Sequence, residues 1–84
     1  MKHFTSSEYW EAFDALPQAI QKKAREKYEL LKDNQFHPSL RLKKIEDYWS
    51  VRIGIRYRAL GIQDGEDVLW FWIGHHKVYD ELIK

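Results

Sequence analysis

Residues 48–58, with the sequence YWSVRIGIRYR, contain the pattern that most restricts how this chain folds. Trp49, Val51 and Ile53 alternate with Ser, Arg and Gly, which is the period-two pattern of a β-strand with one buried face. The same period returns from Tyr57 after a short loop. Two such runs predict a β-hairpin, and therefore a sheet that buries one of its faces.

The length of the hairpin loop decides which side chains lie beside one another. A two-residue loop would mix polar and apolar groups on each face of the sheet. A three-residue loop at residues 54–56 keeps each face consistent and pairs Arg52 with Arg58. We therefore expect Arg52 and Arg58 to share one face, and Arg56 to belong to the loop as a solvated charge.

The paired arginines are the first indication of a functional site. Like charges that face each other across two strands repel, so they do not stabilise a small domain by themselves. The planar guanidinium group fits the geometry of a phosphate. We interpret Arg52 and Arg58 as a phosphate-binding pair.

The residues before the hairpin have the period of a helix. Lys2–Phe4 fits a short edge strand, and Thr5 with Glu8 fits a capping box at the start of a first helix. Pro17 suits the first turn of a second helix that reaches about Lys32. Two helices with a tight joint form an antiparallel helical hairpin.

From Leu40 onward the hydrophobic period changes to two. A loop at residues 36–39 precedes this change, because His37 stands before a proline. We expect strands that begin at Leu40, Tyr48, Tyr57 and Val68, with turns at residues 46–47 and 64–65.

The last strand and the tail have their own pattern. The run VLWFWI at residues 68–73 is apolar on both faces, which predicts an interior strand with Trp70 and Trp72 in the core. The tail HHKVYDELIK fits a short amphipathic helix, and we expect Val78 and Leu82 to face inward.

Together these elements predict a single α+β domain over residues 1–84. It consists of a small twisted antiparallel sheet, an N-terminal helical hairpin packed on one face, and a short C-terminal helix. The absence of cysteine excludes disulfides and thiolate zinc sites and suits a reducing compartment. Because the sequence shows neither a signal-peptide pattern nor a transmembrane span, we expect a cytoplasmic protein without membrane contact.

The net charge is only +1, but the charges are unevenly distributed. Residues 21–58 carry eleven Lys or Arg against five acidic residues, whereas both flanking segments are acidic overall. A basic segment of this kind suggests a polyanion or an acidic protein as partner. Within it we interpret one group as the solvated face of the second helix: Lys22, Lys23, Arg25 and Lys27.

The adjacent histidines invite a metal hypothesis. Neighbouring residues on an extended segment point in opposite directions, so His75 and His76 do not form a metal pair. His3 and His37 have no assigned place near them, and the chain offers no thiolate. We expect no metal and no other cofactor.

Two segments carry a resemblance to a known family, Tyr48–Leu60 with the hairpin YWSVRIG and RYRAL, and Ile73–Leu82 with the tail after WFW. With the preceding helices and the KKI strand, the chain resembles the RelE/ParE superfamily of bacterial toxin–antitoxin toxins over nearly its whole length. RelE-like members enter the ribosomal A site and cut mRNA through attack of the 2′-hydroxyl on the adjacent phosphate, without a metal. ParE-like members share the fold but target DNA gyrase.

The resemblance implies four catalytic residues. Arg52 matches a basic residue of the active face, and Arg58 matches the arginine at the scissile phosphate, where both would neutralise transition-state charge. His76 falls where several members have an arginine, and a histidine there would move the proton of the 2′-hydroxyl or the 5′-leaving oxygen. Tyr79 matches an aromatic residue of the terminal segment that would stack on a base or hold the nucleophile.

Four further residues are expected to contact RNA: Lys43, Lys44, His75 and Tyr48. For Lys43 and Lys44 a solvated strand end is an equal alternative, since one of two consecutive strand residues faces outward. Tyr48 and Trp49 lie on opposite faces, so only one belongs to the core, and we expect Trp49 there.

Three functions remain open at this point. The first is a ribosome-dependent mRNA endonuclease that uses ribosome and mRNA as partners. The second is a non-enzymatic ParE-like inhibitor of DNA gyrase. The third is an inactive toxin-fold protein that only binds its antitoxin, which Ser50 favours because RelE has a catalytic lysine there. An antitoxin partner, acidic and partly disordered, is implied in each case.

Overall fold

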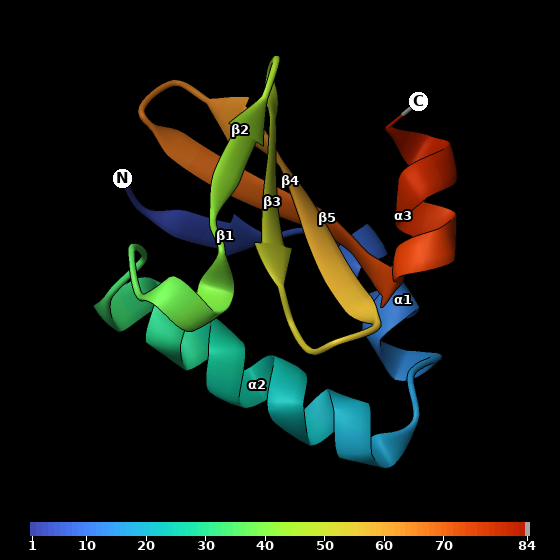
Figure 1. Ribbon diagram of the computed structural model, residues 1–84. Helices are drawn as coiled ribbons and strands as arrows, with labels where there is room; N and C mark the ends of the chain where they lie inside the picture. Colours follow the sequence, from blue (N-terminus) through green and yellow to red (C-terminus); the bar gives the residue numbers. More distant parts are fainter. Residues whose placement is uncertain (84) are drawn as a thin grey trace.

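The computed structural model describes residues 1–83, and a five-stranded sheet with three α-helices organises them (Figure 1). The elements are β1 (His3–Thr5), α1 (Ser7–Asp14), α2 (Gln18–Asp33), the 3-10 helix η1 (Pro38–Leu40), β2 (Lys43–Ile45), β3 (Tyr48–Arg52), β4 (Tyr57–Asp64), β5 (Asp67–His75) and α3 (His76–Leu82). The strand order is β1-β5-β4-β3-β2. The predicted fold class is confirmed, although the sheet is not wholly antiparallel because β1 runs parallel to β5.

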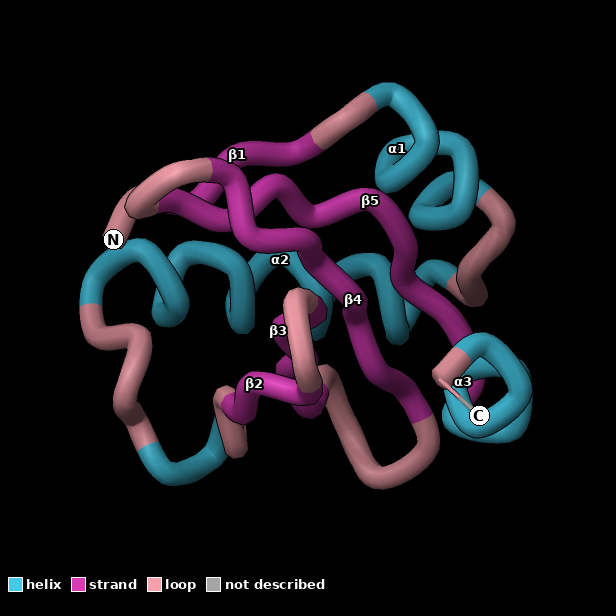
Figure 2. The backbone as a smooth tube through the Cα atoms, turned by 90° about the horizontal axis from the view of Figure 1, so that it is seen from above, coloured by secondary structure: helices cyan, strands magenta, loops and turns pink. Residues whose placement is uncertain are grey.

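One face of the sheet, which we call the helix-covered face, holds the hydrophobic core. On it Val51 pairs with Ala59, and both are buried together with Trp70 of β5. Figure 2 shows α2 running below the strands, with α1 beside β5. Ala24 and Leu31 of α2 are completely or almost completely buried, so the helical hairpin closes this face as predicted.

The register of the β3–β4 hairpin is the predicted one. Arg52 pairs with Arg58, and the Ile53 amide donates to the Tyr57 carbonyl oxygen over 3.0 Å. Arg56 lies exposed in the loop. The arginines therefore lie on the face opposite the core, which we call the groove face.

A bulge in β5 explains how its apolar residues contribute side chains to both faces of the sheet. Gly61 pairs with Trp70, whereas the preceding Leu60 pairs with Trp72, so Phe71 is the extra residue. The shift places Trp70 in the core and leaves Phe71 and Trp72 half-buried. The prediction that β5 is an interior strand is confirmed, since β1 and β4 flank it, but only Trp70 of the two tryptophans is fully buried.

The first helix begins one residue later than the predicted capping box. The Ser6 hydroxyl accepts from the Tyr9 amide, whereas Thr5 belongs to β1 and its hydroxyl accepts from Trp10 Nε1. The prediction of Thr5 as the cap was wrong because β1 pairs with β5 through that residue.

The prediction of a strand from Leu40 was also wrong. His37 accepts from the Ser39 amide and starts η1, and Leu40 is fully buried at its end. Arg41 then adopts a left-handed conformation with φ of 46°, which turns the chain into β2. Strand pairing starts only at Lys43.

The face of α3 that packs inward differs from the predicted one. Tyr79 is 6% exposed, whereas Val78 and Leu82 are 49% and 54% exposed. An aromatic ring has more apolar surface to bury than Val or Leu, which favours the orientation that covers Tyr79. Among residues 1–83, no helix is both long enough and apolar enough to cross a membrane.

Candidate active site

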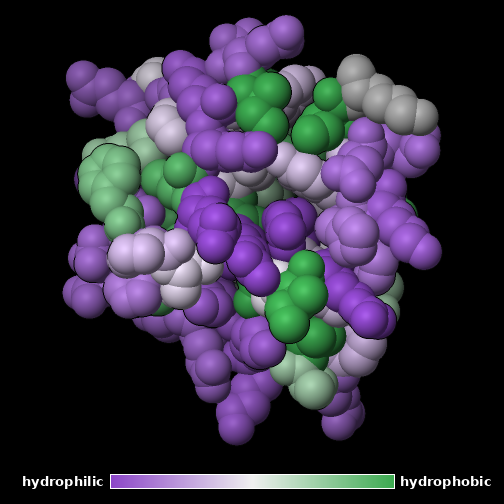
Figure 3. Space-filling model, viewed as in Figure 1, coloured by the Kyte–Doolittle hydropathy of each residue, from purple (hydrophilic) through white to green (hydrophobic). Residues whose placement is uncertain are grey.

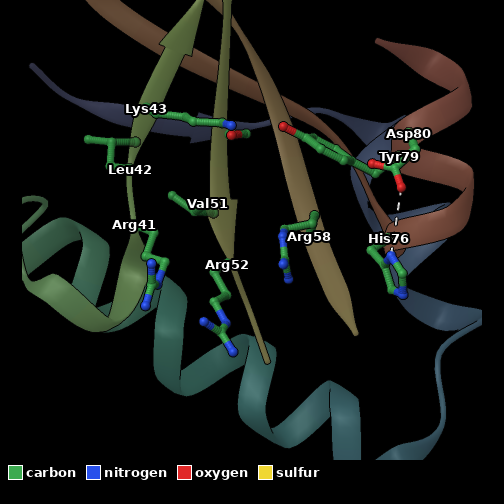
Figure 4. A pocket seen from close by; sticks show the side chains of 10 residues that line it. Arg41, Leu42, Lys43, Val51, Arg52, Arg58, His76, Tyr79 and Asp80 are labelled. Atoms are coloured by element: carbon green, nitrogen blue, oxygen red, sulfur yellow. Dashed lines mark ion pairs between the residues drawn. The ribbon is translucent and has the colours of Figure 1, made fainter. Parts of the chain in front are cut away.

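A groove of about 540 Å³ lies on the groove face, between the β2–β3 edge of the sheet and α3 (Figure 4). Its lining includes four cationic or titratable side chains that approach from different elements: Arg52 from β3, Arg58 from β4, Lys43 from β2 and His76 from α3. In Figure 3 hydrophilic side chains crowd this side of the molecule. The groove therefore has the composition of an anion-binding site.

The two arginines are held by the hairpin loop. Arg58 Nη1 donates to the carbonyl oxygens of Gly54 and Tyr57, each over 2.9 Å, and Arg52 Nε lies 3.4 Å from the same Gly54 oxygen. These bonds use one nitrogen of each guanidinium. The remaining N–H groups have no acceptor among the described residues and are available to an anion.

His76 lies at the opposite wall of the groove. Its Nδ1 is 3.7 Å from Asp80 Oδ2, one helical turn further along α3 (Figure 4). The Asp80 carboxylate lies on the Nδ1 side of the ring, and no hydrogen bond to Nε2 is found among the described residues.

His75 lies next to this wall, not in it. The rings of His75 and His76 stack with centroids 4.6 Å apart, so the prediction that they point in opposite directions was wrong. The reason is that α3 begins at His76, with His75 as its N-cap accepting from the Lys77 amide. The pKa of His75 lies below its usual value, chiefly through desolvation and then through neighbouring cationic groups, His76 first among them.

Tyr79 contributes a buried hydroxyl. The side chain is 6% exposed, and its oxygen has no hydrogen-bond partner among residues 1–83. Figure 4 shows this hydroxyl and Lys43 pointing toward each other across β3. A buried, unpartnered polar atom costs stability, because it has lost its hydrogen bonds to water without gaining a protein partner.

The four predicted catalytic residues, Arg52, Arg58, His76 and Tyr79, thus line one groove, and Lys43 joins them. The other predicted RNA contacts lie outside it. Lys44 pairs with Trp49, its Nζ 5.7 Å from the centre of that ring, and Tyr48 packs its ring against Phe71. Trp49 is half-buried against the core and Tyr48 is exposed, in agreement with the predicted choice between them.

Sequence reasoning missed two lining residues, Arg41 and Asp80. Arg41 was expected in a regular strand, and only its left-handed backbone brings it to the groove. Asp80 follows His76 by four residues in a helix, a spacing that signals contact and could have revealed it.

The fold and the groove place this chain among small toxin domains. A family model for the ParE-like toxin domain matches residues 18–81, and the chain belongs to this family. The predicted membership of the RelE/ParE superfamily is confirmed. No curated protein sequence matches the chain.

Solved structures of low sequence identity share the fold. RelE in the RelB–RelE antitoxin–toxin complex of Methanococcus jannaschii has 18% identity and a TM-score of 0.72, over 96% of this chain and 99% of that one. The YoeB/ParE toxin of Agrobacterium tumefaciens has 16% identity and a TM-score of 0.67, over 90% and 99%. YafQ of E. coli has 8% identity and a TM-score of 0.72, over 93% and 96%.

Proposed function

We propose that this protein is the toxin of a toxin–antitoxin pair and cleaves mRNA on the ribosome, in the bacterial cytoplasm. The observation that carries the proposal is the groove, where Arg52 and Arg58 face His76 and the unpartnered hydroxyl of Tyr79. This set can bind a phosphodiester and transfer a proton beside it.

The reaction is an attack of the RNA 2′-hydroxyl on the adjacent phosphorus. The O2′–P bond forms, the P–O5′ bond breaks and the proton of the 2′-hydroxyl passes to solvent water, which leaves a 2′,3′-cyclic phosphate and a free 5′-hydroxyl. The negative charge on the non-bridging oxygens grows in the transition state. Arg52 and Arg58, already fixed by the Gly54 carbonyl, stabilise that charge without reorganisation. No step of this reaction requires a metal or another cofactor.

His76 is the proton-transfer group in this proposal. Among the described residues it is the one imidazole that lines the groove, and its Nδ1 lies 3.7 Å from Asp80 Oδ2. An imidazole can both give and take a proton near neutral pH. Protonated His76 gives its proton to the leaving 5′-oxygen, which would otherwise depart as a poor leaving group.

Tyr79 acts through its hydroxyl. A ring that is 6% exposed offers no face on which a base could stack. The other expected role, holding the nucleophile, therefore remains for Tyr79. The hydroxyl reaches the groove and holds the attacking 2′-oxygen or a phosphate oxygen by a hydrogen bond.

An antitoxin is the proposed protein partner. Two features support it: the fold of solved antitoxin–toxin complexes such as that from Methanococcus jannaschii, and the basic groove itself. An acidic, partly disordered segment complements such a groove and folds as it binds.

Induced expression in E. coli tests the proposal. We expect rapid translation arrest, with new mRNA 5′ ends at ribosomal A-site positions mapped by sequencing of cleaved transcripts. Arg58→Ala should lower cleavage by about 10²–10³-fold, the loss typical for one preorganised transition-state donor. Its free energy of unfolding should stay within about 0.5 kcal/mol of wild type.

Arg56→Ala is the matched control, because it removes the same charge from the same hairpin outside the groove. It should cleave like wild type. Filamentation with DNA damage and intact mRNA would instead indicate a gyrase inhibitor, and unaffected growth would indicate a protein that only binds its antitoxin. Full cleavage by Arg58→Ala would refute the assignment of the groove.

A further inference from the structure

We infer that a second pocket beside the groove binds another phosphate of the same RNA strand, on the flank of the scissile phosphate away from His76. This inference rests on the proposed function. The second pocket has a volume of about 440 Å³ and lies between α2, η1 and the β3–β4 loop. Its lining is Lys23, Lys27, Pro38, Ser39, Arg41, Arg52, Ile53, Gly54 and Ile55.

The pocket is continuous with the groove through two shared arginines. Arg41 and Arg52 line both, so each guanidinium lies on the boundary between them. Figure 4 shows both guanidinium groups extending toward α2, away from His76. An RNA strand whose scissile phosphate is bound by Arg52 can therefore extend into the second pocket and remain in contact with cationic side chains along its path.

The pocket is strongly basic. Four of its lining residues are cationic and none is acidic. Among the described residues, no ion pair neutralises any of the four, since the recorded pairs are Lys32–Glu29 and His76–Asp80. Cationic side chains that surround one pocket without ion-pair partners repel one another, and a bound phosphate reduces that repulsion.

Lys23 and Lys27 of α2 lie next to the loops that line the pocket, and Lys27 is held there by a hydrogen bond. Lys27 Nζ donates to Ser39 Oγ over 3.0 Å, and Ser39 Oγ is 2.9 Å from His37 Nδ1. A Cβ placed on Gly54 would lie 3.4 Å from Lys23 Cδ, so Lys23 lies directly over the loop that holds the arginines. The interpretation of the α2 cations as one solvated face therefore does not describe Lys27, whereas Lys23 is exposed as expected and lies beside the pocket.

The backbone at Arg41 supports the same inference. A left-handed conformation is unfavourable for a residue with a Cβ, because the Cβ comes too close to the following carbonyl oxygen. At φ of 46°, Arg41 accepts that cost at the point where its side chain reaches both hollows. Glycine, which adopts this conformation freely, would leave the boundary without its second guanidinium.

The test measures binding of a single-stranded RNA oligonucleotide whose cleavage site carries a 2′-deoxy substitution, by fluorescence anisotropy from 50 to 300 mM salt. The variants are Lys23→Ala/Lys27→Ala and the control Lys22→Ala/Lys32→Ala, which removes two charges from α2 outside the pocket. A plot of log K against log[salt] should be less steep for Lys23→Ala/Lys27→Ala than for wild type, by about 0.7 for each phosphate contact that the variant loses. The control should keep the wild-type slope.

A second arm shortens the RNA by one nucleotide at a time from each end. Removal of the phosphate that enters the pocket should weaken binding to wild type but not to Lys23→Ala/Lys27→Ala. Lys23→Arg/Lys27→Arg should restore the slope, and circular dichroism should show that all variants are folded. Inorganic phosphate, added as competitor, should displace the oligonucleotide only at concentrations far above that of the RNA.

The outcomes separate this inference from the proposed function. A wild type that cleaves mRNA in cells, with equal slopes for the lysine variant and wild type, overturns the second pocket and leaves the proposed function standing. A wild type that binds the oligonucleotide with the predicted slope change but cleaves no mRNA supports the pocket and refutes the nuclease. Absence of RNA binding by wild type overturns the second pocket, and the proposed function is then decided by cleavage of mRNA in cells alone.

Discussion

The two faces of β3 and β4 differ completely although they come from alternate residues of the same two strands. On the helix-covered face Val51 pairs with Ala59, and both are buried in the core. On the groove face Arg52 pairs with Arg58, and both remain partly exposed. Period two thus lets one hairpin stabilise the domain with one set of side chains and present the site with the other.

The two faces also differ in whether their buried polar groups have hydrogen-bond partners. On the helix-covered side His3 accepts from Trp70 Nε1 over 3.0 Å through Nδ1, and its Nε2 lies 2.8 Å from Gln35 Oε1. On the groove side the Tyr79 hydroxyl has no partner among residues 1–83. His3 on the packed face has protein partners for both ring nitrogens, whereas the groove side leaves the Tyr79 hydroxyl without one among residues 1–83.

The largest expected effect is on the helix-covered face. Trp70→Ala should lower the free energy of unfolding by about 3–5 kcal/mol, because Trp70 is 1% exposed and its removal leaves a large cavity. Arg52→Ala, on the groove face, should change it by less than about 0.5 kcal/mol. Urea unfolding followed by circular dichroism measures both. If Trp70→Ala and Arg52→Ala lowered the free energy of unfolding equally, the division of stability and function between the two faces would be contradicted.

A pH effect of intermediate size should arise from His3. Burial lowers the pKa of His3, because desolvation disfavours the charged form of the ring. Above the unfolded pKa of about 6.5 both states are neutral and the stability is complete. As the pH falls below that value, the unfolded chain takes up a proton that the folded chain resists, so the stability falls.

The measurement is urea unfolding at pH 7.5 and pH 5.5 for wild type and His3→Gln. One proton corresponds to a slope of at most about 1.4 kcal/mol per pH unit. His3→Gln should be less stable at pH 7.5 but lose less on acidification. The same pH dependence in both proteins would assign it to another group.

No loss of stability is expected for Tyr79→Phe, which is the most informative variant for the comparison of the two faces. Its free energy of unfolding should be unchanged or rise by up to about 1 kcal/mol, because the variant no longer buries an unpartnered hydroxyl. Cleavage of mRNA should fall.

Tyr28→Phe is the matched control. The Tyr28 hydroxyl donates to the His3 carbonyl oxygen over 3.0 Å on the helix-covered side. Its loss should cost about 1 kcal/mol and leave cleavage intact. If Tyr79→Phe destabilised the protein like Tyr28→Phe and cleaved normally, the Tyr79 hydroxyl would have a structural role instead.

Local features of the chain were predictable because they depend on neighbouring residues. Alternation of side chains and the length of the loop fixed the pairing of Arg52 with Arg58, which the structure reproduces. The bulge at Leu60/Gly61 was not predictable from alternation, because the run VLWFWI is apolar at every position and indicates no register.

The errors at the ends of elements have a common cause. Thr5 and Ser6 are both good N-caps, and only the pairing of β1 with β5 decides between them. Val78, Tyr79 and Leu82 are all apolar enough to face inward, and packing of α3 against the sheet selects Tyr79. Local sequence leaves such choices nearly equal in free energy, and tertiary contacts settle them.

The sequence by itself determined the fold class, the hairpin register and the pair of arginines, because these follow from the period and spacing of residues close together in the chain. The family resemblance implied that His76 and Tyr79 join the two arginines, and the structure brings all four to one groove. Only the tertiary structure decided that Arg41 joins them and that Lys23 and Lys27 line a second pocket beside the groove. Those residues are far apart in sequence, and their meeting depends on how α2, η1 and α3 pack against the sheet, which no local pattern encodes.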